Sequence, residues 1–93
     1  MEISQELLEK VQQLAEILTP ISEMSVLLDI NEDELREEIV KPDSELHRVY
    51  FLGMATVRQQ IRKNELDLAA AGSPQAVQRT HEYRNQMLEE IKI

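Results

Sequence analysis

Hydrophobic residues recur every three or four positions along most of the chain, which is the spacing of one face of an α-helix. In the first segment Leu7, Val11 and Leu14 follow this spacing, while charged and amide side chains fill the positions between them. No segment alternates apolar and polar residues as a half-buried β-strand would. The pattern predicts an all-α protein, in which the apolar face of the first helix consists of Ile3, Leu7, Val11, Leu14 and Leu18.

Prolines and capping residues divide this pattern into separate helices. Pro20 suits the first turn of the second helix, since it has no amide hydrogen to leave unpaired there. Asn31, with Glu34 three residues later, resembles a capping box that opens the third helix. Pro42 closes that helix because the residue before a proline is pushed out of the helical region. The predicted helices span about 4–18, 21–28, 31–41, 43–71 and 74 onward.

The two glycines have different expected roles. Gly53 lies inside the fourth predicted helix, where glycine costs about 1 kcal/mol relative to alanine. It either admits a neighbouring helix at close range, marks a kink or is simply tolerated. Gly72 is placed as a left-handed helix terminator, followed by Ser73 as N-cap and Pro74 as the first helical residue. Because this turn is tight, we expect the fourth and fifth helices to form a long antiparallel hairpin.

The length of 93 residues predicts one domain with two parts. Residues 1–42 would form an N-terminal helix plus a helix-turn-helix, and residues 43–93 the long helix hairpin packed against them. A chain of this size buries only about two-thirds of its unfolded surface. We therefore expect it to associate with copies of itself or with a partner.

The segment Ser22–Ile39 has the spacing of a helix-turn-helix, a pair of short helices that often places its second helix in a DNA groove. Asp29 stands at the turn position that glycine usually holds, and it enters the left-handed region more readily than most residues. The outward positions of the second helix carry mainly acids, which the phosphates bordering a DNA groove repel. The small and apolar positions of the motif are Met24, Ser25, Leu28, Ile30, Leu35 and Ile39.

Charge is distributed unevenly, although the net charge is −8. Residues 1–45 carry 13 acids against three basic residues, whereas residues 46–84 carry six basic residues against three acids. Such polarity suits head-to-tail packing between subunits or a local basic surface near nucleic acid. Arg58, Arg62 and Lys63 form the basic cluster of the fourth helix, which Arg79 and Arg84 could join. This cluster either faces phosphates or forms salt bridges with Glu65, with Asp67 or with another subunit.

The sequence lacks the motifs that usually indicate several classes of function. The sequence has no cysteine, and neither His47 nor His81 has a neighbour at a metal-binding spacing, so we expect no metal site. No Gly-rich phosphate loop and no Gly-x-Ser-x-Gly elbow is present, so we expect a non-enzymatic protein without a cofactor. No stretch has the hydropathy of a signal peptide or a membrane span. We therefore expect a soluble cytoplasmic protein with no membrane partner.

The order of these parts resembles the phage small-terminase type of DNA-packaging protein. The resemblance lies in a helix-turn-helix followed by "SELHRVYFLGMATVRQQIRKNELDLAAAGSPQAVQ", Ser44–Gln78, with an aromatic-x-x-Gly step and an "AxxGSPxAxQ" element at the return turn. It implies recognition of phage DNA, cyclic assembly through the helix hairpin and a large ATP-driven terminase subunit as partner. Carried over by position, the DNA-facing residues would be Asn31, Glu32, Asp33, Arg36 and Glu37.

Two functional hypotheses follow. The first is a non-enzymatic DNA-binding or DNA-packaging protein of phage or prophage type that binds double-stranded DNA as an oligomer. The second is a helical protein-interaction module that uses the helix-turn-helix scaffold without binding DNA, with the acidic third helix docking on a basic surface. The candidate DNA-binding residues are Asn31, Arg36, Lys41, Arg48, Arg58, Arg62 and Lys63.

Overall fold

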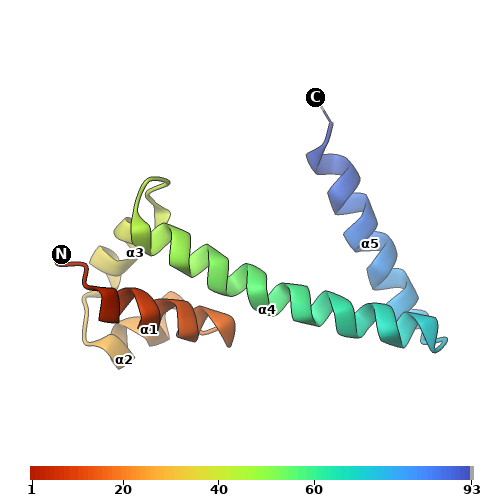
Figure 1. The fold of residues 1–93 in the computed structure, drawn as a ribbon, viewed down its shortest axis with the longest axis horizontal. Helices are drawn as coiled ribbons and strands as arrows, with labels where there is room; N and C mark the ends of the chain where they lie inside the picture. The colour runs from red at the N-terminus through yellow and green to blue at the C-terminus, as the bar shows by residue number, and fades with distance from the viewer. Residues whose placement is uncertain (93) are drawn as a thin grey trace. The chain divides into compact units, whose positions relative to one another are not determined.

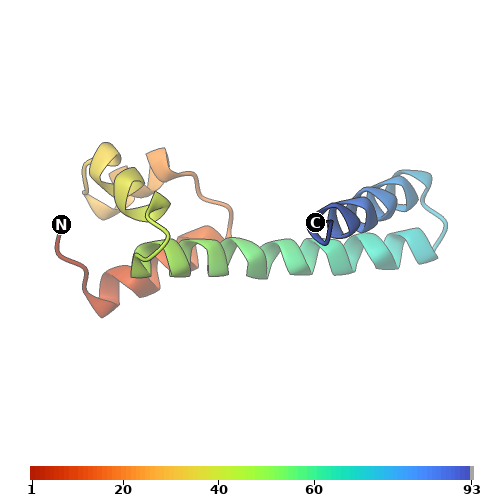
Figure 2. The same ribbon diagram turned by 90° about the horizontal axis from the view of Figure 1, so that it is seen from above.

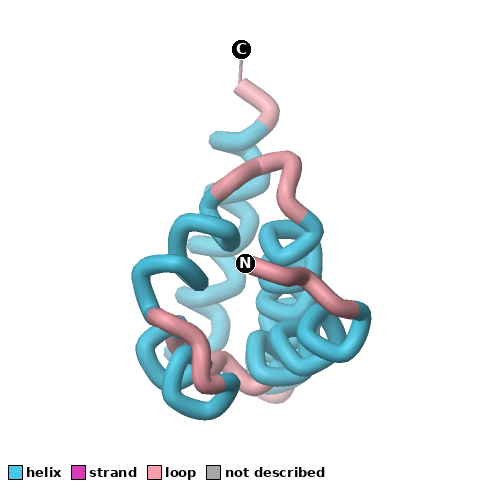
Figure 3. Tube along the Cα trace, turned by 90° about the vertical axis from the view of Figure 1, so that its left-hand side faces the viewer, coloured by secondary structure: helices cyan, strands magenta, loops and turns pink. Residues whose placement is uncertain are grey.

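The computed structural model describes residues 1–92 and confirms the all-α prediction. Short loops join the helices, and no strand occurs in these residues (Figure 3). The chain divides into two compact units, here called unit 1 (Met1–Val57) and unit 2 (from Arg58 onward), and their boundary falls inside the fourth helix. The helices labelled in Figure 1 are α1 (Gln5–Glu16), α2 (Ile21–Leu28), α3 (Glu32–Val40), α4 (Glu45–Ala70) and α5 (Pro74–Glu90).

Helix starts agree with the predicted caps. The side chain of Asn31 accepts a hydrogen bond from the amide of Glu34 at 3.1 Å, and Ser73 Oγ accepts one from Ala76 at 3.3 Å. Ser4 caps α1 in the same way. Each cap satisfies an amide that has no partner within its own helix.

Three helices end in the same motif, in which one residue takes a left-handed conformation and the next amide reaches back to the last turn. That residue is Leu18 (φ 60°) after α1, Asp29 (φ 54°) after α2 and Gly72 (φ 97°) after α4. The amide of Thr19, for example, donates to the carbonyl of Leu14 at 3.0 Å. The sequence predicted Gly72 and Asp29 for this role. It did not predict Leu18, so α1 ends two residues earlier than expected.

The core of unit 1 draws on all four of its helices. On α1 the buried residues are Leu8, Val11 and Ala15. The predicted burial of Val11 is confirmed, and Ile3, Leu7 and Leu14 are half-buried against the core. The prediction missed Leu8 and Ala15 and was wrong for Leu18, which is exposed. Buried residues from the other helices complete the core: Met24, Leu35, Ile39, Leu46 and Val49.

Gly53 explains this orientation of α1. A Cβ atom added to Gly53 would lie 2.5 Å from the carbonyl oxygen of Gln12 and 2.8 Å from Cβ of Ala15. The backbones of α1 and α4 therefore approach each other at a distance that only glycine on one side and alanine on the other permit. Of the three roles considered for Gly53, close approach of a neighbouring helix is the one that it has.

Unit 2 consists of the second half of α4, the tight turn at Gly72 and α5. Ala76 is buried, and Nη1 of Arg79 donates to Oε1 of Glu65 at 2.7 Å. Beyond these contacts α5 runs back and diverges from α4 (Figures 1 and 2). The turn is as expected, but the two helices are not packed along their length, and Met87 near the end of α5 is exposed.

Replacing Gly53 tests the contact between α1 and α4. Gly53→Ala should destabilise the protein by about 1–3 kcal/mol, because the clash outweighs the better helix propensity of alanine. The measurement is urea denaturation followed by far-ultraviolet circular dichroism. Thr56→Ala, at an exposed position of the same helix, is the control and should change stability by less than about 0.5 kcal/mol. Equal stability of Gly53→Ala and the parent protein would contradict the close approach.

Removing Arg79 tests the ion pair of unit 2. Glu65 is 8% exposed, and its second oxygen is buried without a hydrogen-bond partner in residues 1–92. Arg79→Met should lower the midpoint of thermal unfolding, because the Glu65 carboxylate stays buried after its partner is lost. The readout is thermal unfolding, and the double variant Arg79→Met with Glu65→Leu should recover most of the loss. No recovery would show that the pair matters for another reason.

Candidate nucleic-acid interface

The candidate basic residues of α3 and of its C-terminal end, Arg36 and Lys41, are already paired with acids. Arg36 donates to Glu32 at 3.1 Å and to Asp33 at 3.2 Å, so its charge is balanced within α3. Asn31 is exposed, but its side-chain oxygen serves as the cap of α3. The three acids in the first turn of α3 lie where the helix dipole favours negative charge. The outer surface of this helix is therefore acidic.

Lys41 is paired in the same way at the other end of α3. Its ammonium donates to Oε1 of Glu38 at 2.7 Å, and Ser44 Oγ donates to the other oxygen at 3.3 Å. The hydrogen bond from Lys41 lowers the pKa of Glu38, and the same bond raises the pKa of Lys41. The hydrogen bond from Ser44 joins the end of α3 to the start of α4, and Lys41 neutralises the carboxylate that accepts it.

The basic residues of α4 are arranged differently. Arg48 in unit 1, and Arg58, Arg62 and Lys63 in unit 2, take part in none of the ion pairs formed within residues 1–92. Glu65, a possible acid partner of this cluster, is held by Arg79 instead. The cations of α4 are thus available to an external anion.

Arg62 and Lys63 line a cleft of about 370 Å³ between α4 and α5 in unit 2, here called the cationic cleft. Arg84 of α5 lines it from the other side, and no acid is among the lining residues. The cleft also has apolar walls, which include Leu66 and Met87. The cleft therefore brings three cations together without an acid.

The units differ strongly in charge. Unit 1 holds 13 acids and four basic residues, a net −9, whereas unit 2 holds six basic residues and five acids, a net +1. Anionic ligands are therefore repelled by unit 1 and meet weak attraction at unit 2, concentrated at the cationic cleft and at Arg58.

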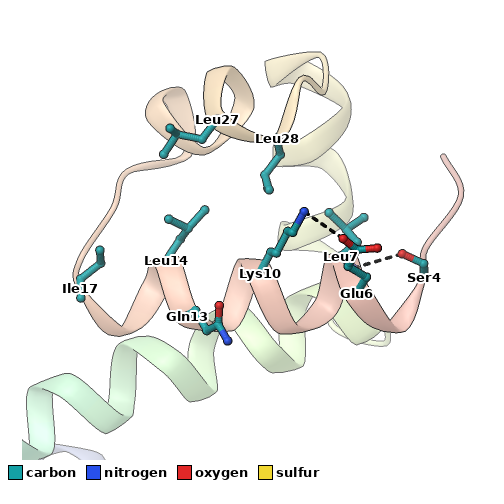
Figure 4. A pocket seen from close by; sticks show the side chains of 9 residues that line it. All are labelled: Ser4, Glu6, Leu7, Lys10, Gln13, Leu14, Ile17, Leu27 and Leu28. Carbon is teal, nitrogen blue, oxygen red and sulfur yellow. Dashed lines mark hydrogen bonds and ion pairs between the residues drawn. The ribbon is translucent and has the colours of Figure 1, made fainter.

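A second concave surface was not predicted from the sequence. It lies in unit 1 between α1 and α2, with a volume of about 650 Å³, and is here called the α1/α2 groove (Figure 4). Leu14 of α1 and Leu28 of α2 point toward each other across it, and the ion pair between Glu6 and Lys10 lies at one side. The available signal was the apolar stripe of α2, "ISEMSVLL", in which Ile21, Met24, Leu27 and Leu28 lie on one side of the helix.

Among residues 1–92, no group of three or more His, Cys, Asp or Glu side chains has an arrangement that could hold a metal ion. None of the described helices combines the length and hydropathy needed to cross a membrane. No protein-family model, curated protein or solved structure matches the chain.

Proposed function

We propose that the protein is a non-enzymatic DNA-binding protein of the phage DNA-packaging type, which binds double-stranded DNA as an oligomer through Arg58, Arg62 and Lys63. The observation that carries this proposal is the difference in pairing. The basic residues of the helix-turn-helix segment are neutralised by neighbouring acids, whereas those of the second half of α4 have no acid partner in residues 1–92. The unpaired cations are the groups that phosphates would bind most strongly.

The resemblance to small-terminase proteins supports this class of function. The resemblance implies that the DNA-facing positions fall on α3. In this chain, however, the only arginine of α3, Arg36, forms ion pairs with Glu32 and Asp33. We therefore assign the phosphate contacts to α4 and expect α3 to stay outside the DNA groove. The large terminase subunit remains the partner that the resemblance implies.

Oligomerisation is part of the proposal because one copy offers few contacts. Three phosphate contacts give weak binding at physiological salt, since non-specific affinity grows with the number of phosphates neutralised. Several linked copies bind a long duplex far more tightly than one copy, because each later contact forms within an existing complex. An acidic chain can bind DNA in this way if its cationic surfaces face the same duplex.

A second candidate function is a helical protein-interaction module. It is favoured by the apolar walls of the cationic cleft, because a phosphate backbone gains nothing from Leu66 and Met87. An amphipathic acidic helix would use both the cations and the apolar walls. This candidate predicts binding to an acidic helical partner and none to DNA.

Salt-dependent DNA binding separates the two candidates. We expect fluorescence anisotropy of a labelled duplex to show binding at about 50 mM salt, with affinity falling at least about 40-fold by about 200 mM, as three phosphate contacts require. The absence of binding at the lower salt would reject the DNA-binding proposal and favour the interaction module.

Removing the positive charges of Arg58, Arg62 and Lys63 tests whether these residues bind the DNA. The triple variant Arg58→Gln, Arg62→Gln, Lys63→Gln should reduce the salt slope by about 3 and weaken binding to all sequences alike. The matched control is Arg36→Gln, which removes a paired arginine and should leave affinity unchanged or slightly reduced. If the control loses binding and the triple variant keeps it, α3 is the DNA-binding element and our assignment to α4 is wrong.

A further inference from the structure

The cationic cleft of unit 2 is lined by two stripes of side chains, one on α4 and one on α5. Within each stripe the residues follow the three- and four-residue spacing of a single helix side. The α4 stripe consists of Gln59, Arg62, Lys63 and Leu66, and the α5 stripe consists of Thr80, Tyr83, Arg84 and Met87. One copy of the chain therefore supplies the whole lining.

The three cations of the cationic cleft have no acid partner in the described part of the chain. Arg62, Lys63 and Arg84 take part in none of the ion pairs formed by residues 1–92. Arg62 is also half-buried, so it has already lost part of its hydration shell. Charge-assisted hydrogen bonds to an anion are strongest where water competes least. The cleft therefore favours a ligand that brings negative charge.

The acids of unit 2 do not supply that charge. Glu65 is held by Arg79 at 2.7 Å, and Glu89 is held by Lys92 at 3.0 Å. All five acids of the unit lie outside the lining of the cleft: Glu65, Asp67, Glu82, Glu89 and Glu90. The positive charge of the cleft is thus left for a ligand to balance.

The apolar side chains of the cleft restrict which anions fit. Leu66 is 56% exposed and Met87 is 69% exposed, so an inorganic anion or a phosphate backbone would leave both in water. A ligand with an apolar body would cover them and gain from burial of that surface. The volume of about 370 Å³ is at the lower end of the range of small-molecule pockets, which also combine apolar walls with a few polar groups. These features select a small organic anion.

We propose that the cationic cleft binds a small anionic amphiphile of the fatty-acid class. The carboxylate is held by Arg62, Lys63 and Arg84, and the hydrocarbon chain covers Leu66 and Met87. This binding needs neither DNA nor a second copy of the chain. Because Arg62 and Lys63 are also assigned to DNA, an occupied cleft should weaken DNA binding, and this consequence alone rests on the proposed function.

Titration with octanoate, followed by the amide resonances of the isotopically labelled protein, tests the site. We expect saturable shifts at residues 59–66 and 80–87. Acetate, which has the anion without the chain, should bind at least about 10-fold more weakly, because it leaves the apolar walls exposed. 1-Octanol, which has the chain without the anion, should also bind at least about 10-fold more weakly.

Two variants separate the contributions of charge and apolar surface. The charge variant is Arg62→Gln with Arg84→Gln, and the apolar variant is Leu66→Gln with Met87→Gln. Each should weaken octanoate binding at least about 10-fold. Glutamine keeps helix propensity, and circular dichroism checks that both variants stay folded. The matched controls lie outside the lining and should bind like the parent protein: Arg48→Gln with Arg58→Gln for charge, and Leu68→Gln for exposed apolar surface.

Three results would overturn the proposal. The first is the absence of octanoate binding, and the second is equal affinity for octanoate and acetate, which would mean a site for anions alone. The third is unchanged octanoate binding in both variants, with shifts at Leu14 and Leu28, which would place the ligand in the α1/α2 groove. DNA binding is read separately by anisotropy. A protein that binds DNA but not octanoate would reject this inference alone, and one that binds octanoate but not DNA would reject the proposed function alone.

Discussion

The close approach of α1 to α4 at Gly53 is the contact on which the arrangement of unit 1 depends. Because no Cβ stands at that position, Gln12 and Ala15 rest directly on the backbone of α4. This fixes the rotation of α1 about its own axis and turns Leu8 and Val11 toward the core. Leu7 and Leu14 are then left on the side of α2, where they line the α1/α2 groove. The missing side chain on one helix thus creates an apolar surface on the far side of another.

The ends of most helices were predictable from the sequence, but the rotation of α1 about its own axis was not. Helix ends follow from hydrogen bonds between near neighbours, so Asn31, Ser73 and Gly72 could be assigned from the order of residues alone. The rotation of α1 could not, because Leu7 and Leu8 are adjacent and equally apolar. The contact that chooses between them is with Gly53, some 40 residues away.

At the candidate interface, likewise, the sequence did not determine which acid pairs with which basic residue. The sequence identified Arg58, Arg62 and Lys63 as a cluster but offered Glu65 and Asp67 as equally near partners. The structure resolves the choice for Glu65 because the turn at Gly72 brings Arg79 onto it. On α3, by contrast, pairing is local, since Arg36 lies three and four residues from its acids. In an acidic chain the pairing of each cation is therefore more informative about anion binding than the net charge.

The weak attachment of α5 affects how readily proteases can cleave the protein. Ala76 is the only buried side chain of this helix in the described part of the chain, and the pair between Arg79 and Glu65 holds only its first turns. The later turns can open with little free energy, and an open segment is what proteases cleave. Proteolysis of the chain would therefore begin in the last turns of α5.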